Sequence, residues 1–390
     1  MCDVVTYEQL DQEAWRQLVR ESRTGTWFQT PEAYEFLASM PELFQPFVVG
    51  VASLQLPPKG KSDEVHPSFQ GRTEDRLMLK GVCVGYVTKE RNPIKQLFTR
   101  RAIILGGPVF ANDATDEEVT TLMRAVRNLS SLQGRGGKRL LSPIYIETRN
   151  FNDYSTWKEA FEAAEFEYKA HLNFHVDCTD REKIWERLSE NRKRQIKRAQ
   201  ANCVTIEEAQ SESEIQEWYR ILHQLYQTKV KTPLWPMSFF RSAYRQGVGK
   251  FLLVKHNGNV IGGSFCVELK RDREKSPMSN LQSPISNLQS PITTNESVVY
   301  EWFECGLNGE CKEQYPSVMA TWAGLQRANE AGIQRYDMMG AGMPNVPYGV
   351  RDFKAEFGGE MVEHGRWLCV NKPLLYRIGS WGVKILKKQG

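Results

Sequence analysis

One segment in the last fifth of the sequence, Tyr336 to Gly359, combines residue types that suit an anionic substrate. A short apolar strand is predicted over Arg335 to Met339, and it continues into a loop rich in glycine and proline. A short polar helix with Arg351 and Lys354 follows. Glycines let the backbone approach a ligand closely, and cations after such a loop suit an anion at the mouth of a sheet. The alternative is an ordinary strand-to-helix connection, and the pattern alone leaves both open.

A second candidate is the basic end of a predicted helix, Asn191 to Gln200. It carries five cations within seven residues. At 100° per residue, Arg194, Lys197 and Arg198 share one helix face. Cations suit a helix C-terminus, so a solvated charged face is one interpretation. The other is a patch that contacts the phosphates of RNA or of a nucleotide-linked substrate, and it would use Arg192, Arg194, Lys197 and Arg198.

The elements around these candidates alternate between strands and helices, which predicts an α/β fold with mixed sheets. Thr30 before Pro31 predicts a helix start, and Asn257-Gly258 between apolar runs predicts a tight hairpin. Single helices are expected over Tyr7 to Glu21 and over Arg181 to Ala201. The other expected helices are 115–131, 154–164, 212–229, 237–246 and 315–331, and the other expected strands are 47–52, 77–86, 103–109, 144–148, 173–177 and 298–304.

Two segments fall outside this alternation. Between Lys270 and Ser297 a seven-residue repeat, Ser-Pro-Ile-Ser-Asn-Leu-Gln, carries a proline in each unit. It therefore predicts a disordered insertion, at about 271–296, rather than a coiled coil. Lys372 to Lys388 predicts a basic amphipathic helix, which either docks on the first domain or contacts a membrane surface.

Composition narrows the class of protein. The chain has 390 residues, 41% hydrophobic and 25% charged, with a net charge of +4, which is typical of a soluble protein with two domains. No apolar run approaches the roughly 20 residues that span a bilayer, and the start of the sequence does not resemble a secretory signal. The eight cysteines form no CxxC pair and are expected to be free thiols. The histidines show no ligand spacing that predicts a metal site, and the glycine-rich Gln133 to Lys138 lacks the ending of a P-loop.

The segment Tyr348-Gly-Val-Arg-Asp-Phe-Lys-Ala-Glu-Phe-Gly-Gly359, with Asp337-Met-Met-Gly before it, resembles the C-terminal signature of the Fem family. These proteins are peptidoglycan interpeptide-bridge aminoacyltransferases. Phe28 to Pro31, Asn191 to Ala199 and Leu225 to Thr228 are also similar to the family, so the resemblance spans nearly the whole chain.

The resemblance implies two GNAT-like (acyl-CoA N-acyltransferase-like) domains: 1–170, completed by 366–390, and 171–365. It implies transfer of an amino acid from aminoacyl-tRNA to an amine of a peptidoglycan precursor in the cytoplasm, with no cofactor. Lys354 and Phe353 would form the reaction centre. A fixed cation stabilises the charge that develops in ester aminolysis, and a general-base role for the lysine ranks second. The substrate-binding candidates are Arg351, Tyr348, Gly340, Lys231 and Tyr226.

Two departures from the Fem pattern leave the identity of the acceptor substrate open. Lys231 stands where the family usually has an arginine, which loses bidentate phosphate binding, and no coiled-coil arm is visible.

The first alternative is an N-acyltransferase that uses acyl-CoA on a cell-envelope sugar or peptide. The segment Asn308 to Ser317 lacks the glycine turn that holds the CoA pyrophosphate in such enzymes. The second alternative is a non-catalytic protein that binds RNA or the cell envelope.

Overall fold

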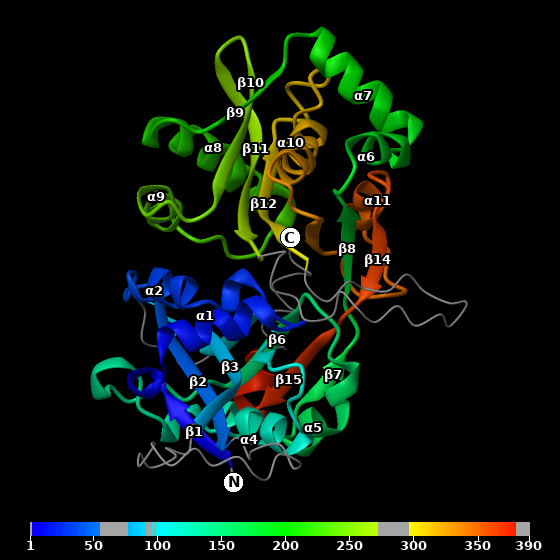
Figure 1. Cartoon of the computed structure of the whole chain (residues 1–390). Coiled ribbons are helices and arrows are strands. Elements are labelled where there is room, and N and C mark those ends of the chain that lie inside the picture. The colour runs from blue at the N-terminus through cyan, green and yellow to red at the C-terminus, as the bar shows by residue number, and fades with distance from the viewer. Residues whose placement is uncertain (1, 55–76, 91–95, 97–98, 272–295, 380–390) are drawn as a thin grey trace, which may run out of the picture. The chain divides into compact units, whose positions relative to one another are not determined.

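The structure is a computed structural model that describes residues 2–54, 77–90, 96, 99–271 and 296–379 (Figure 1). Outside the described residues lie the segment 56–76, whose Pro, Gly, Lys and Asp residues predict a loop, the repeat insertion and the distal half of the expected C-terminal helix. The chain forms two compact units. The first contains the chain up to Arg149, Tyr154–Glu167 and the chain from Trp367 onward; the second contains Asn150–Asp153 and Tyr168–Arg366.

The first unit is built on one sheet with the strand order β1-β2-β3-β4-β6-β15-β7, and β5 pairs with β3. β15 comes from the end of the chain and lies between β6 and β7, so the last segment completes the first sheet (Figure 1). The strands are β1 Cys2–Thr6, β2 Phe44–Leu54, β3 Leu77–Thr88, β4 Arg101–Gly106, β5 Val109–Phe110, β6 Tyr145–Asn150, β7 Glu167–Lys169 and β15 Arg366–Val370.

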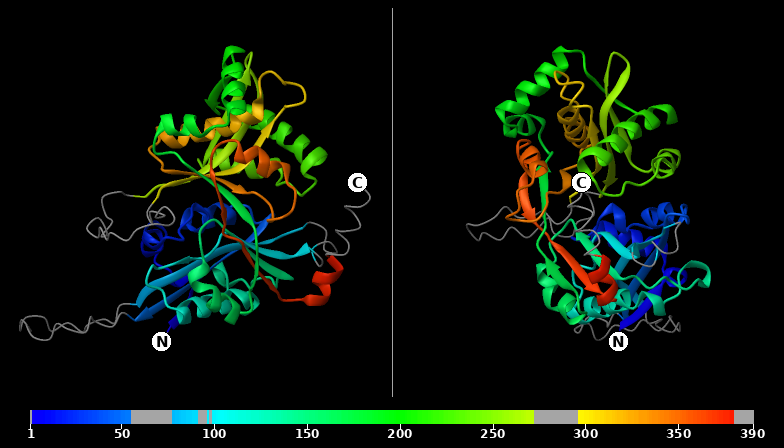
Figure 2. Two further views of the ribbon diagram at one scale, coloured as in Figure 1. Left: turned by 90° about the vertical axis from the view of Figure 1, so that its right-hand side faces the viewer. Right: turned by 180° about the vertical axis from the view of Figure 1, so that it is seen from behind.

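Helices cover both faces of this sheet (Figure 2). One face packs against α4 (Asp116–Arg127) and α5 (Lys158–Ala163), and the other against α1 (Gln12–Glu21) and α2 (Pro31–Ala38). The predicted start of α2 is confirmed, because Thr30 Oγ1 accepts a hydrogen bond from Ala33 N–H at 3.1 Å. The single helix expected over Tyr7 to Glu21 is wrong: a 3₁₀ turn ends at Gln9, and Asp11 caps a new helix. The remaining 3₁₀ turns are Trp27–Gln29, Leu129–Ser131, Arg135–Gly137 and Ser155–Trp157.

The second unit has a sheet with the order β14-β8-β13-β12-β11-β10-β9, in which β12 and β13 run parallel and the other pairs antiparallel. The predicted hairpin is confirmed, with Asn257 and Gly258 at φ of 50° and 79° between β10 and β11. The strands are β8 Leu172–Asp177, β9 Thr205–Glu208, β10 Lys250–His256, β11 Asn259–Leu269, β12 Val298–Gly306, β13 Arg335–Gly340 and β14 Glu360–Glu363.

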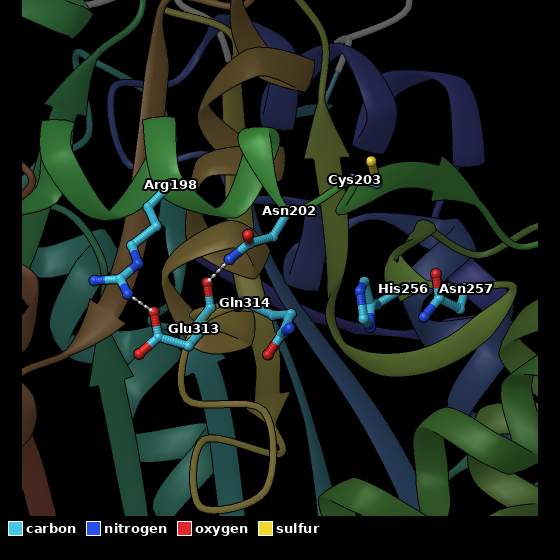
Figure 3. A pocket seen from close by; sticks show the side chains of 7 residues that line it. All are labelled: Arg198, Asn202, Cys203, His256, Asn257, Glu313 and Gln314. Atoms are coloured by element: carbon cyan, nitrogen blue, oxygen red, sulfur yellow. Dashed lines mark hydrogen bonds and ion pairs between the residues drawn. The ribbon is translucent and has the colours of Figure 1, made fainter.

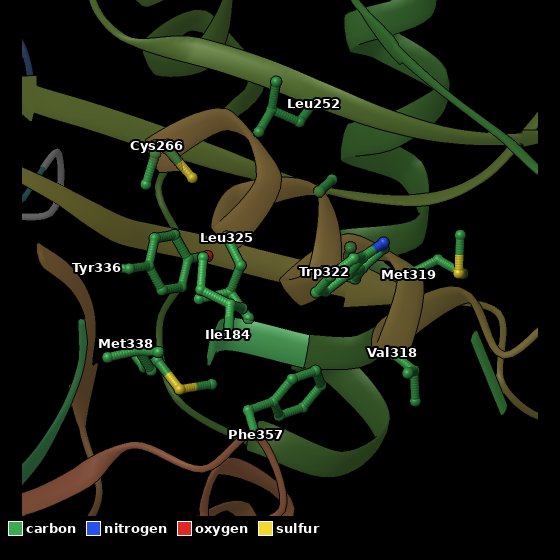
Figure 4. Packing of buried hydrophobic residues seen from close by; sticks show 14 of the residues in the cluster. Ile184, Leu252, Cys266, Val318, Met319, Trp322, Leu325, Tyr336, Met338 and Phe357 are labelled. Carbon is green, nitrogen blue, oxygen red and sulfur yellow. The ribbon is translucent and has the colours of Figure 1, made fainter. Parts of the chain in front are cut away.

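One face of the second sheet carries α6 (Arg181–Arg187), α7 (Glu190–Ala201) and α10 (Pro316–Glu330), which contribute to one hydrophobic core (Figure 4). The opposite face carries α8 (Glu212–Leu225), a π-helical turn (Tyr226–Val230) and α9 (Met237–Arg245). The single helix expected over Arg181 to Ala201 is wrong. The chain leaves the helix at Leu188, and Ser189 starts α7 by accepting a hydrogen bond from Arg192 N–H at 3.2 Å.

The predicted short polar helix is confirmed as α11 (Gly349–Ala355). It ends before Gly358, which has φ of 73° and comes so close to Arg187 that a Cβ would lie 2.2 Å from the Arg187 carbonyl oxygen. A side chain at this position would therefore push α11 away from α6.

The described part of the C-terminal segment includes a helical stretch, 373–379. Tyr376 packs edge-on against Tyr145 of β6, with 5.3 Å between the ring centroids. Leu374 and Ile378 are 76% and 55% exposed. The stretch thus contacts the first unit and leaves apolar side chains open to solvent. No helix within the described residues is both long and apolar enough to cross a bilayer.

Candidate functional site

The candidate site lies where the parallel strands β12 and β13 separate. They pair only at their beginnings, with Tyr300 opposite Asp337 as the last pair, although β12 continues to Gly306 and β13 to Gly340. The carboxyl ends of parallel strands are where α/β proteins commonly bind ligands. Beyond the last pair, Lys354 of α11 bonds to the carbonyls at the end of β13, and the charge of Glu301 on β12 acts on it.

Lys354 of α11 fills the end of β13. Its side chain is buried, and Nζ donates hydrogen bonds to the carbonyl oxygens of Met338, Gly340 (2.9 Å) and, at 3.5 Å, Met339. Burial lowers the pKa of Lys354, while the carboxylates of Glu301, Asp337 and Glu304 act in the opposite direction. An ammonium group has three hydrogens, so the carbonyls engage all of them, and the contact with Met339 is the weakest.

A strained turn makes the three carbonyls converge. Met339 has φ of 58°, a left-handed conformation that a non-glycine residue adopts only with support. Asp337 gives that support, because its Oδ1 accepts a hydrogen bond from Met339 N–H at 2.7 Å. The other oxygen of this fully buried carboxylate faces His175 Nε2 at 3.3 Å. Burial would raise the pKa of Asp337, but the neighbouring His175 lowers it overall.

His364 adds a second imidazole to this corner. Its ring lies 5.1 Å from the His175 ring, and burial, together with the charge of His175, lowers the pKa of His364 to about 3. No sequence pattern indicates this Asp337–His175–His364 cluster, because its members come from β13, β8 and the turn after β14.

Phe353 and Arg192 form one packed unit. The Arg192 guanidinium lies 4.4 Å from the centroid of the Phe353 ring and 5.2 Å from that of Phe357. It also donates to Gln195 at 2.6 Å and to the Phe353 carbonyl at 3.4 Å. Arg192 is 6% exposed. The structure therefore corrects its predicted place on an exposed phosphate-contacting face: it supports the Phe353 ring from inside the protein.

The other three predicted phosphate-contacting cations are exposed. Arg194 donates to Asn191 Oδ1 at 3.0 Å, Lys197 lies 5.7 Å from the Trp185 ring, and Arg198 forms an ion pair with Glu313. Exposed ion pairs are weak, so these contacts leave the cations able to rearrange around a ligand.

Arg198 also lines an open hollow of about 580 Å³ at the end of α7 (Figure 3). Asn202 donates to the Glu313 carbonyl there at 2.9 Å. The hollow is polar and lies beside the β10–β11 turn. Its lining residues are Arg198, Asn202, Cys203, His256, Asn257, Glu313 and Gln314.

The substrate-binding candidates divide into two groups. Gly340 belongs to the Lys354 site through its carbonyl. Arg351 holds the loop that follows Gly340 by donating to the carbonyls of Ala341 (3.0 Å) and Met343. Tyr348, in the same region, is 42% exposed. Tyr226 and Lys231 lie in and after the π-helical turn on the α8–α9 face, where the Tyr226 and Phe303 rings are 6.4 Å apart.

Two acidic residues of β12 complete the site, and neither was predicted from the sequence. Glu301 is 7% exposed and accepts hydrogen bonds from Tyr336 Oη at 2.8 Å and Thr321 Oγ1 at 3.3 Å. Glu304 lies three residues further along β12. Burial raises the pKa of both carboxyl groups. Two glutamates in an apolar strand do not by themselves indicate a functional site, because the sequence does not show that Lys354 lies near them.

The first backbone amide of α10, that of Ser317, is bound within the chain. Asn308 donates to Ser317 Oγ at 2.8 Å and accepts from Ser317 N–H at 3.2 Å. The amide that begins this helix is thus satisfied internally. Among the described residues, no group of three His, Cys, Asp or Glu side chains is arranged to hold a metal ion.

No protein-family model and no curated protein sequence matches the chain. Among solved structures the chain is similar to FemX, with a TM-score of 0.62 and 10% identity over 96% of this chain and 99% of that one. It also matches L-PGS from Bacillus licheniformis (TM-score 0.44, 11% identity, 74% of this chain and 81% of that one). A third match is the glucosamine N-acetyltransferase region of a fungal β-N-acetylglucosaminidase (TM-score 0.46, 10% identity, 94% and 38%). The chain has the FemX fold, mixed α/β with two GNAT-like domains, as expected.

Proposed function

We propose that this protein is an aminoacyltransferase that moves an amino acid from aminoacyl-tRNA to an amine of a peptidoglycan precursor, of the lipid II or UDP-MurNAc-pentapeptide type. The observation that carries the proposal is the place of Lys354 and Phe353. Lys354, which together with Phe353 resembles the Fem signature, bonds to the carbonyls at the end of β13 in a chain with the FemX fold. The reaction needs no cofactor, since the tRNA ester is itself the activated donor.

The chemistry requires stabilisation of negative charge. When an amine attacks the ester carbonyl, the carbonyl oxygen becomes an oxyanion, and a fixed cation in a dry site lowers the energy of this state. Lys354 is such a cation. Because all three of its hydrogens meet carbonyls, it acts either through its charge or by exchanging the long Met339 contact for the oxyanion. A general-base role for Lys354 is the weaker alternative, since the loss of its proton would break these contacts.

The remaining side chains supply substrate contacts in this proposal. Arg194, Lys197 and Arg198 offer exposed charge to the tRNA phosphates. Arg192 fixes the partly exposed Phe353 ring, which would stack with or support the terminal adenosine. The acceptor precursor would be held by two pairs of residues, Arg351 with Tyr348 and Lys231 with Tyr226. The protein would work in the cytoplasm, and the exposed apolar residues of 373–379 would favour transient contact with the inner face of the membrane.

Two observations support tRNA over acyl-CoA as the donor. A pyrophosphate needs unoccupied amides at a helix start, whereas Asn308 already binds Ser317 N–H at the start of α10. The exposed cations of α7 suit a long polyanion.

The test compares donors directly. Purified protein should transfer labelled amino acid from charged tRNA to a stem-peptide precursor, and it should transfer little from acetyl-CoA. Efficient acetyl transfer without transfer from tRNA would replace the proposal by the acyl-CoA alternative. Binding of tRNA without transfer to any precursor would instead favour the non-catalytic alternative.

A further inference from the structure

A β-bulge in β12 brings its two glutamates to one face of the sheet. In the pairing with β11, Phe265 lies opposite Phe303 and Cys266 opposite Glu301, so Trp302 is an extra residue. Trp302 and Phe303 both contact Phe239 of α9, with ring centroids 5.4 and 6.5 Å apart. Regular alternation would place Glu301 and Glu304 on opposite faces, but the extra residue resets the alternation.

Contacts to α10 confirm the shared face. Glu301 accepts a hydrogen bond from Thr321 of α10, and the Glu304 carboxyl group interacts with Ser317 in the first turn of the same helix. The β11 residue opposite Glu304 is Ser264, whose hydroxyl donates to the Ala320 carbonyl at 3.3 Å. Both carboxyl groups therefore face the side of the sheet that carries α10.

The two carboxyl groups differ in their exposure and in their hydrogen bonds. Glu301 is enclosed, and its Oε1 accepts from Tyr336 and Thr321. Glu304 is partly exposed and lies beside Ser317, which is itself held by Asn308. Within the described residues its Oε1 is buried without a hydrogen-bond partner. A buried acceptor without a donor is costly, and a substrate N–H would satisfy it.

The charges that act on Glu304 come from three elements: Glu301 on its own strand, Lys354 of α11 and Arg192 of α7. Burial and the charge of Glu301 raise the pKa of Glu304 to about 8, against the two cations. A carboxylate of this basicity takes a proton near neutral pH far better than an ordinary glutamate does.

We infer that Glu304 is the catalytic base of the proposed transfer: it binds the acceptor amine through its free oxygen and takes the proton that the amine loses. The inference rests on the proposed reaction. The amine nitrogen bonds to the ester carbonyl carbon, and its surplus proton passes to the Glu304 carboxylate. The bond between that carbon and the ribose 3′ oxygen then breaks, and the departing oxygen receives the proton from Glu304.

The test is the pH profile of transfer between pH 6 and 10, at saturating charged tRNA, for the wild type and Glu304→Gln. We expect the wild-type kcat to rise with pH through about 8. The variant should lose about 100-fold in kcat and lose this rise, with an unchanged Kd for charged tRNA. Glu304→Asp, which keeps the carboxylate, should recover part of the rate and the pH dependence. Glu310→Gln, an exposed neighbour in the next loop, is the matched control and should behave as wild type.

A near-normal rate in Glu304→Gln would overturn the inference, and so would a reduced rate that keeps the wild-type pH profile. A third outcome would also overturn it: that Glu304→Gln discriminates less than the wild type between tRNA carrying an aminoacyl group and tRNA carrying a hydroxyacyl group. The last result would mean that Glu304 recognises the donor's amino group instead. Thermal melts of each variant separate loss of folding from loss of chemistry. If the wild type transfers only from acetyl-CoA, the proposed donor is wrong, but the same profile still tests the base, because an amine is acylated in both reactions.

Discussion

Replacing Lys354 by methionine removes a buried charge while keeping most of the side-chain volume. The carbonyls of Met338 and Gly340 lose their donor, and the longer contact with Met339 is lost as well. A hydrogen bond to a charged group contributes about 1.5–3 kcal/mol. The two shorter contacts therefore predict a loss of about 3–6 kcal/mol in unfolding free energy. Part of this loss is offset because a neutral side chain is less costly to bury than a charged one.

The effect on catalysis should be separate from the effect on stability. If the charge of Lys354 stabilises the oxyanion, its loss should lower kcat by about 100-fold or more in molecules that remain folded. The assay is transfer of labelled amino acid from charged tRNA, measured well below the variant's melting temperature. Circular dichroism gives the folded fraction by which the rate is divided.

Lys255→Met is the matched control for this prediction. Lys255 is also largely buried in the second unit, where it pairs with Glu207 at 2.8 Å and Glu214 at 2.5 Å, and it lies outside the candidate site. It should lose stability and keep its kcat per folded molecule. A near-normal rate in Lys354→Met, or an equal loss of rate in both variants, would refute the role of Lys354 in the reaction.

Three further predictions concern other parts of the chain. Arg194→Ala with Lys197→Ala should weaken tRNA binding and reduce the slope of log K against log salt concentration by about 1–2; an unchanged slope would remove both residues from the RNA contact. Lowering the pH from 6.5 towards 4 should destabilise the second unit, because the pKa of His364 is lowered to about 3 and the unfolded chain takes up the proton first. His364→Phe should flatten this dependence in chemical denaturation at several pH values. Deleting Ser276 to Thr293 should leave melting temperature and transfer rate largely intact, because Arg271 N–H donates to Ser297 Oγ at 2.9 Å and joins the two ends of the insertion; clear unfolding would show that the insertion is structural.

Signals that act between residues close in sequence were sufficient for much of the fold. Thr30 with Pro31 marked the start of α2, and Asn257-Gly258 marked the turn between β10 and β11. Each depends on the backbone preference of one or two residues. The breaks at Asp11 and Ser189 were missed, although both residues are good helix caps, because the apolar pattern on either side continued at helical spacing.

The environment of Arg192 could not be read from its neighbours in sequence. Its position among four other cations favoured an exposed face, whereas its guanidinium packs against Phe353, 161 residues further along the chain. The motif predicted Lys354 and Phe353 as candidates but gave no indication of what surrounds them, because neighbours such as Arg192 are far away in sequence. Charge density along a helix predicts that some side chains are exposed, and packing decides which.

The placement of Glu304 depends on one residue that no local pattern marks. In Val298 to Gly306, regular alternation puts Glu301 and Glu304 on opposite faces, and skipping one residue puts them on the same face. Any of the intervening residues could be the one to skip, and the choice is made by the register with Phe265 and Cys266 on β11. Trp302 is accommodated as the extra residue because α9 offers Phe239 as a partner for its ring. Thus an aromatic contact on one face of the sheet helps to bring both carboxyl groups to the opposite face, which carries α10.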